Sequence, residues 1–124
     1  MALTTSPLHD TSLPDVVIKQ TDLEHPADID VFDGPKSVHA ITIDNTANGS
    51  EANYAKFYNN TSATPGTDVP DLKIRLAQGT SRTIHIADGV SFSTAFSMFA
   101  TSVTADDGTQ TAPGSSIVCI VVGS

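Results

Sequence analysis

Residues 36–44 read KSVHAITID, and this stretch decides the fold class. Ile41 and Ile43 alternate with Thr42 and Asp44, and a period of two places the isoleucines on one face of an extended chain. Such a segment is typical of a half-buried β-strand. It ends at residues 45–50, NTANGS, where Asn, Gly and Ser favour turn geometry.

The same texture continues through the rest of the chain. Further alternating or apolar stretches lie at residues 53–59, 72–76, 80–87, 96–103 and 117–122, and turn signals such as Pro65-Gly66, Asp88-Gly89 and Pro113-Gly114 separate several of them. The stretch at 96–103 carries bulk on both faces, which predicts a strand covered on both sides. We predict an all-β fold, an antiparallel β-sandwich of jelly-roll type with seven or eight strands and no helix.

The first 35 residues have a different composition. Four prolines exclude a continuous helix, and seven carboxylates against Lys19 give this segment a net charge of −6 out of the −8 of the whole chain. Only Val16, Val17 and Ile18 look able to pair as a short strand. We therefore predict two parts: an extended acidic arm, residues 1–35, that adheres to a surface, which could be that of another chain, and a sandwich domain, residues 36–124.

Charge and cysteine content exclude several classes of function. Six scattered basic residues cannot follow a phosphate backbone, so no nucleic-acid partner is expected. No apolar run approaches the roughly 18 residues of a membrane span, so no membrane partner is expected. Cys119 is the single cysteine, and no apolar signal segment follows Met1, which together predict assembly in a reducing cytosol.

No pattern of reactive residues indicates an enzyme. The four histidines lack metal-ligand spacing, and the calcium-loop-like stretch at 28–34 has Phe32 at a ligand position. Cys119 lies in an apolar run without a neighbouring cation, and Asp106 and Asp107 are expected to point to opposite sides of an extended chain. We expect no catalytic residues, no metal, no cofactor and no small-molecule substrate.

The stretch at 53–62, NYAKFYNNTS, leaves two interpretations open. Phe57 is expected in the core, with Tyr54, Lys56 and Tyr58 facing outward. The outward tyrosines could form a sugar-binding platform, which makes a carbohydrate-binding module the more distant alternative. The triplets at 48–50, 59–61 and 60–62 match the glycosylation sequon, but turn formation is the favoured explanation for their asparagines.

The order of segments resembles a group of small β-sandwich structural proteins of tailed bacteriophages, notably those of marine and cyanobacterial hosts. The matching stretches are HAITIDNTAN at 39–48, residues 54–103 from YAKFYNNTS to FATSV, and the loop that precedes SIVCIVV. The resemblance covers about two-thirds of the chain and transfers no active-site residue. It implies a virion component, assembled in the host bacterial cytoplasm.

Within that group, the expected role is a capsid decoration or cement protein on the capsid surface, and a tail, baseplate or fibre adaptor is the alternative. The expected partners are the major capsid protein and copies of the chain itself, as a homotrimer. Acidic residues of the arm could meet basic capsid patches, and its short strand could join a partner's sheet edge. The residues expected to touch partners are Val16, Val17, Ile18, Asp28, Asp30, Phe32, Tyr54, Lys56 and Tyr58.

Overall fold

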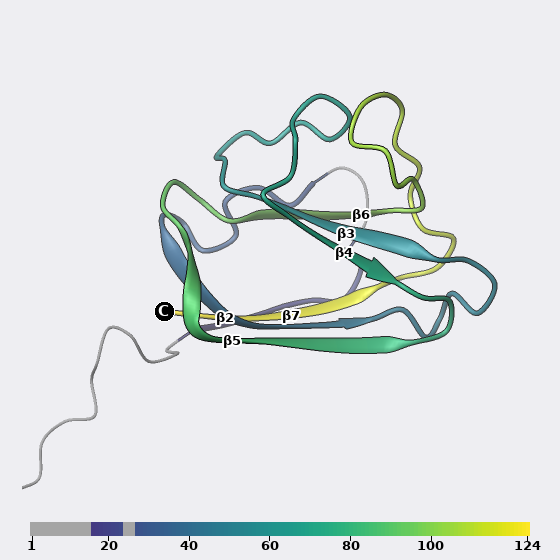
Figure 1. Ribbon diagram of the computed structural model, residues 1–124, viewed down its shortest axis with the longest axis horizontal. Coiled ribbons are helices and arrows are strands. Elements are labelled where there is room, and N and C mark those ends of the chain that lie inside the picture. The colour runs from purple at the N-terminus through teal and green to yellow at the C-terminus, as the bar shows by residue number, and fades with distance from the viewer. Residues whose placement is uncertain (1–15, 24–26) are drawn as a thin grey trace, which may run out of the picture.

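A computed structural model describes residues 16–23 and 27–124, which form seven antiparallel β-strands in two facing sheets (Figure 1). The four-stranded sheet has the order β1-β7-β2-β5 and contains β1 (Val16–Gln20), β7 (Val118–Gly123), β2 (Lys36–Asp44) and β5 (Ser81–Phe92). The three-stranded sheet has the order β4-β3-β6 and contains β4 (Leu72–Leu76), β3 (Asn53–Tyr58) and β6 (Ser97–Thr101). The predicted all-β antiparallel sandwich is confirmed.

The main core fills the space between the two sheets. In β7 the residues alternate between buried and half-buried, so Cys119 and Val121 point inward, as the alternation of an extended strand requires. Phe96 is the centre of an aromatic cluster, with ring centroids 5.4 Å from Phe57 and 4.6 Å from Phe92. Burial of these rings supplies a large share of the hydrophobic stabilisation.

A β-bulge in β2 changes which of its residues face the core. Against β7, the register of β2 shifts between Val38 and Ala40, so one extra residue, His39, is accommodated in β2. Against β5 the extra residues, 86–89, lie in β5 instead. Val38 and Ile41 both reach the core although they are three residues apart. His39 is also buried, and its Nε2 lies 2.8 Å from Ser124 Oγ.

Much of the expected arm belongs to the sandwich itself. The short strand predicted at residues 16–18 forms, as β1, but it pairs with β7 of the same chain, with Val16 opposite Gly123 and Gln20 opposite Cys119. Leu23 and Phe32 lie in the main core. The predicted division into an arm, residues 1–35, and a sandwich, residues 36–124, is therefore wrong for the described residues. The reason is that β1 forms one edge of the four-stranded sheet and the residues that follow it contribute to the core. Residues 1–15 and 24–26 lie outside the described part of the chain.

A second segment of the expected arm closes the edge of β6. Asp28 N donates to Met98 O at 2.8 Å, Met98 N donates to Asp28 O at 2.9 Å, and Val31 N donates to Phe96 O at 2.9 Å. These bonds satisfy backbone groups that an open sheet edge would leave exposed. Residues 27–31 thus act as a partial extra strand on the three-stranded sheet.

Two loops cover the outer face of the three-stranded sheet. The loop at 59–71 joins β3 to β4, and the loop at 102–117 joins β6 to β7; Figure 1 shows both above this sheet. All residues of β6 are buried, which confirms the prediction of a strand covered on both faces. The loops are joined to each other, because Gly108 N donates to Gly66 O at 3.0 Å. This arrangement creates a small second layer beneath the loops.

Candidate functional site

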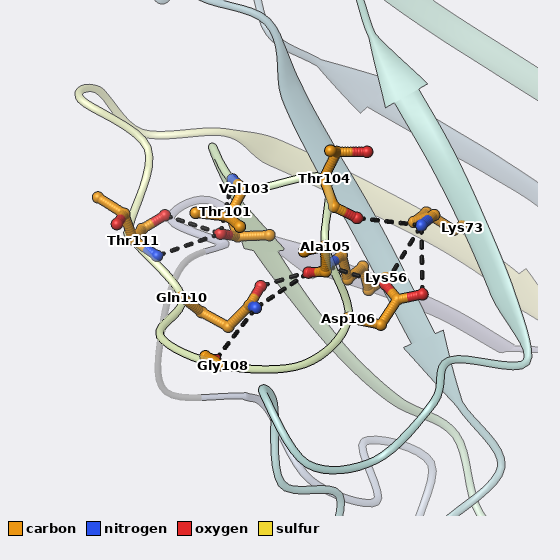
Figure 2. Close-up of polar contacts among 10 residues, drawn as sticks. All are labelled: Lys56, Lys73, Thr101, Val103, Thr104, Ala105, Asp106, Gly108, Gln110 and Thr111. Atoms are coloured by element: carbon orange, nitrogen blue, oxygen red, sulfur yellow. Dashed lines mark hydrogen bonds and ion pairs between the residues drawn. The ribbon is translucent and has the colours of Figure 1, made fainter.

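Lys56 occupies the centre of the layer beneath the loops. It lies on the outward side of β3, yet its relative exposure is 0%. Its Nζ lies 2.6 Å from Ala105 O, 3.2 Å from Gln110 Oε1 and 3.0 Å from Asp106 Oδ1 (Figure 2). Burial of an ammonium group is costly unless it is paired and hydrogen-bonded, and here three oxygens surround it.

Asp106 links this buried cation to a second one. Lys73 on β4 stands directly opposite Lys56 in the sheet, and its Nζ lies 3.2 Å from the same Asp106 Oδ1 (Figure 2). Like charges on facing positions of neighbouring strands repel, and the shared carboxylate between them removes that penalty. Lys73 Nζ also donates to Thr104 O at 3.1 Å, so both lysines hold the same loop.

The pKa of Asp106 is shifted by these two neighbours. Partial burial alone would raise it, but hydrogen bonds and charge from Lys56 and Lys73 outweigh burial and hold the pKa of this carboxyl below its ordinary value of 3.8. Asp106 therefore remains a carboxylate at neutral pH. The cluster carries two positive charges and one negative charge.

Further hydrogen bonds shape the loop around Lys56. Gln110 Nε2 donates to Ala105 O at 3.0 Å, and Thr101 Oγ1 donates to Thr111 O at 2.9 Å (Figure 2). Ser102 N donates to Thr111 O at 2.9 Å, which closes the base of the loop. The loop is thus fixed at its base on β6 and at its middle on β3 and β4.

The chemistry of this cluster is that of a structural clamp. A lysine nucleophile needs a free amine that a substrate can reach, and Lys56 Nζ is enclosed. Nearby Tyr58 is also enclosed: burial, followed by the charges of Asp106 and Asp68, raises the pKa of its phenol to about 12. In the main core between the two sheets, burial and then the charge of Asp28 raise the pKa of the Cys119 thiol to about 12. Both groups keep their protons at neutral pH.

The three residues of β3 that are expected to contact partners differ in exposure. Tyr54 is half-buried, but Lys56 and Tyr58 have relative exposures of 0% and 1%. The expectation that these two side chains face solvent is wrong, because the loop at 102–117 covers Lys56 and Ala63 of the loop at 59–71 packs with Tyr58. Tyr58 instead packs against Phe99 with ring centroids 6.2 Å apart. The sequence offered one signal that was missed, namely a Lys on an otherwise apolar face together with an acidic loop.

The expected partner residues before β2 are also spread apart. Val16 and Ile18 pack against the core, whereas Val17 points outward with 61% exposure. Asp28 accepts a hydrogen bond from Gln20 Nε2 at 2.9 Å. Asp30 has a positive φ of 48° and accepts from Gly34 N at 2.8 Å, so it shapes a turn. Phe32 is buried in the core.

The asparagines of the sequon triplets make structural hydrogen bonds, as the turn interpretation predicted. Asn48 is buried, and its Nδ2 donates to Asn45 Oδ1 and to Ser115 O, each at 3.0 Å. Asn59 Oδ1 accepts from Thr94 N at 2.8 Å, and Asn60 Oδ1 accepts from Ser62 N at 2.8 Å. Asn48 and Asn59 thus join neighbouring loops, and Asn60 stabilises a turn within its own loop.

The described residues contain neither a metal-binding cluster nor a membrane-spanning helix. Among residues 16–23 and 27–124, no three His, Cys, Asp or Glu side chains are grouped so that they could hold a metal ion. The same part of the chain contains no helix of the length and apolarity needed to cross a membrane. Comparison with known protein families, with curated protein sequences and with solved structures gives no match for this chain.

Proposed function

We propose that this protein is a non-enzymatic structural component of a bacteriophage virion, a capsid decoration or cement protein that binds the outside of the head. The sandwich is braced internally, which supports this role. The observation that carries the proposal is the clamp beneath the loops, where Lys56, with Lys73 and Asp106, holds the loop at 102–117 on the three-stranded sheet. Such bracing suits a subunit that must keep its shape while it stabilises its neighbours.

The reactive groups support a structural role over a catalytic one. Two potential nucleophiles, the Lys56 amine and the Cys119 thiol, are both enclosed by packing. The resemblance in strand and turn order to phage sandwich proteins gives the proposal its location. The partners proposed are the major capsid protein and two further copies of the chain around a local threefold point, where tethered contacts raise one another's effective concentration.

A carbohydrate-binding module has less support. A stacking platform requires aromatic faces that a sugar can reach, and Tyr58 does not reach solvent. Tyr54 alone remains accessible on β3. A glycan array probed with the wild type and with Tyr54→Ala tests this alternative directly.

The proposal is tested by locating the chain in intact particles. Antibody labelling and electron microscopy of purified particles are expected to show many copies distributed over the head. Label confined to one vertex would instead indicate a tail, baseplate or fibre adaptor, and absence from washed particles would refute a virion role.

A test of attachment through the N-terminal residues requires a deletion shorter than residues 1–35. Leu23 and Phe32 belong to the core, and β1 begins at Val16, so deletion of residues 1–35 would remove part of the sandwich. Deletion of residues 1–15 retains every described core residue. We expect this variant to unfold at the wild-type urea concentration and to occupy fewer sites on capsids. Unchanged occupancy would exclude these residues from anchoring.

A further inference from the structure

The outer face of the four-stranded sheet is unusually apolar. Strands alternate between faces, so the outward residues of β7 are Val118, Ile120 and Val122, all half-buried and all aliphatic. On β1 the outward residues are Val17 and Lys19. A sheet with one face toward water normally presents polar residues on that face.

The register joins these residues into one patch. Val17 stands opposite Val122, and Lys19 stands opposite Ile120. On the other side of β7, Ala40 pairs with Val122 and continues the apolar row onto β2. We call the set Val17, Val118, Ile120 and Val122 the β1–β7 patch.

No described segment covers the β1–β7 patch. The two loops lie over the opposite sheet, and Figure 1 shows no described part of the chain beyond the outer face of β2, β5 and β7. Val17, at 61% exposure, is among the most exposed large apolar side chains of the described residues. With the half-buried Val118, Ile120 and Val122 it forms a contiguous, partly exposed apolar area, and such areas are typical of protein interaction sites.

The charges around the patch indicate the kind of partner. Asp22 follows the end of β1, and Asp44, the last residue of β2, stands opposite Val118 of the patch. Lys19, on β1, is a basic residue within this face, and His85 lies on the same face two strands away from β7, on β5. Asp44 stays charged because hydrogen bonds from Thr46 lower its pKa. The border is thus acidic, in a chain with a net charge of −8.

We propose that the β1–β7 patch docks on an apolar surface of a different protein subunit, bordered by basic residues. A second copy fits less well, because it would bring carboxylates against carboxylates across the contact. This inference rests on the proposed function for the identity of the subunit, which is then a capsid protein. It assigns attachment to a sheet face that the clamp leaves free.

The test uses particles from a phage whose gene for this chain is disrupted, and measures rebinding of the purified full-length chain by co-sedimentation. Ile120→Asp and Val17→Asp are expected to weaken binding at least about tenfold, as loss of a central apolar contact does. In Ile120→Asp the new carboxylate lies opposite Lys19, which gives it a partner and preserves the fold. Val17→Asp changes an exposed side chain, so it remains informative if the first variant misfolds.

Val69→Asp is the matched control. Val69 is 76% exposed in the loop at 59–71, over the other sheet, and its variant adds the same charge away from the patch. Its binding is expected to equal that of the wild type. Lys19→Glu is expected to tighten binding, because it removes the cation that faces a basic border, and added salt is expected to reduce this gain.

The outcomes separate the docking face from the virion role. If the wild type does not rebind, the proposed function fails, and its docking partner fails with it. If the wild type rebinds and the patch variants bind as well as Val69→Asp, the docking face alone is refuted. A dimer in sedimentation velocity that Ile120→Asp abolishes would identify a second copy as the occupant and overturn the proposal. A hydrophobic dye that binds the chain only after deletion of residues 1–15 would show coverage by its own N-terminus, with the same consequence.

Discussion

Replacement of Asp106 by Asn should destabilise the protein through Lys56, a residue fifty positions earlier. The variant keeps the shape of the side chain and an oxygen that can accept a hydrogen bond, but it removes the charge 3.0 Å from the buried Nζ. Breaking a fully buried ion pair costs about 3–5 kcal/mol. Because the Asp106 side chain is 28% exposed and two other oxygens still contact Nζ, we expect a loss of about 2 kcal/mol in the free energy of unfolding.

Urea unfolding followed by circular dichroism measures this loss, with the slope of free energy against urea as a check that the denatured state is unchanged. Asp107→Asn is the matched control: it makes the same change in charge one residue away, on an exposed side chain. It is expected to change stability by less than about 0.5 kcal/mol. Equal effects of the two substitutions would refute the reasoning, since Lys56 would then not depend on Asp106.

The effect also has a defined pH dependence. The pKa of Asp106 is lowered in the folded state from an ordinary value of 3.8, so its ionisation stabilises the fold above that value. The difference in free energy of unfolding between the wild type and Asp106→Asn should be constant from neutral pH to about pH 5. It should shrink as the pH falls below 3.8 and the folded carboxylate gains its proton. A difference that grows toward acid pH would contradict the assignment.

Three further experiments test other parts of the structure. Gly66 and Gly108 both have positive φ, but a Cβ added at Gly66 would collide with the Gly108 carbonyl, whereas a Cβ added at Gly108 would meet no atom. In urea unfolding, Gly66→Ala should therefore cost about 3 kcal/mol and Gly108→Ala about 1 kcal/mol. Equal costs would exclude the close contact between the two loops. Cys119 should resist thiol-specific reagents in the native protein and react fully in guanidinium chloride, because burial raises the pKa of its thiol to about 12. Asn48→Asp should cost about 2 kcal/mol in urea unfolding, since it places a carboxylate oxygen against Asn45 Oδ1 and Ser115 O, which both accept from the Asn48 amide.

The strands could be predicted from the sequence because their signal is local. The alternation around Ile41 and Ile43, the apolar run of β7 and the bulk on both sides of β6 each depend on a few neighbouring residues, and each strand formed as expected. The long loop between Phe57 and Leu72 was predictable for the same reason, since Pro65-Gly66 interrupts the alternation.

The candidate site could not be predicted, because it depends on contacts that are distant in sequence. Nothing in the spacing of Lys56 and Asp106 reports that the loop after β6 folds back over β3. The partner of β1 could not be predicted either, because the sequence of a short strand does not indicate which sheet edge it will pair with. Pairing with β7 leaves Val17 outward but makes Val16 and Ile18 part of the packed interior.

The pairing of β1 with β7 also sets an order of events during synthesis. Val16 lies opposite Gly123, so the first described strand acquires its neighbour only after residue 123 has left the ribosome, more than a hundred residues later. Until then the β2 edge that β7 will occupy is open as well, and the growing chain presents unsatisfied strand edges to other chains. Such non-local pairing slows folding. The yield of folded protein in the cell should therefore depend on how quickly β7 is synthesised. Slower translation of the residues before β7 is expected to favour aggregation.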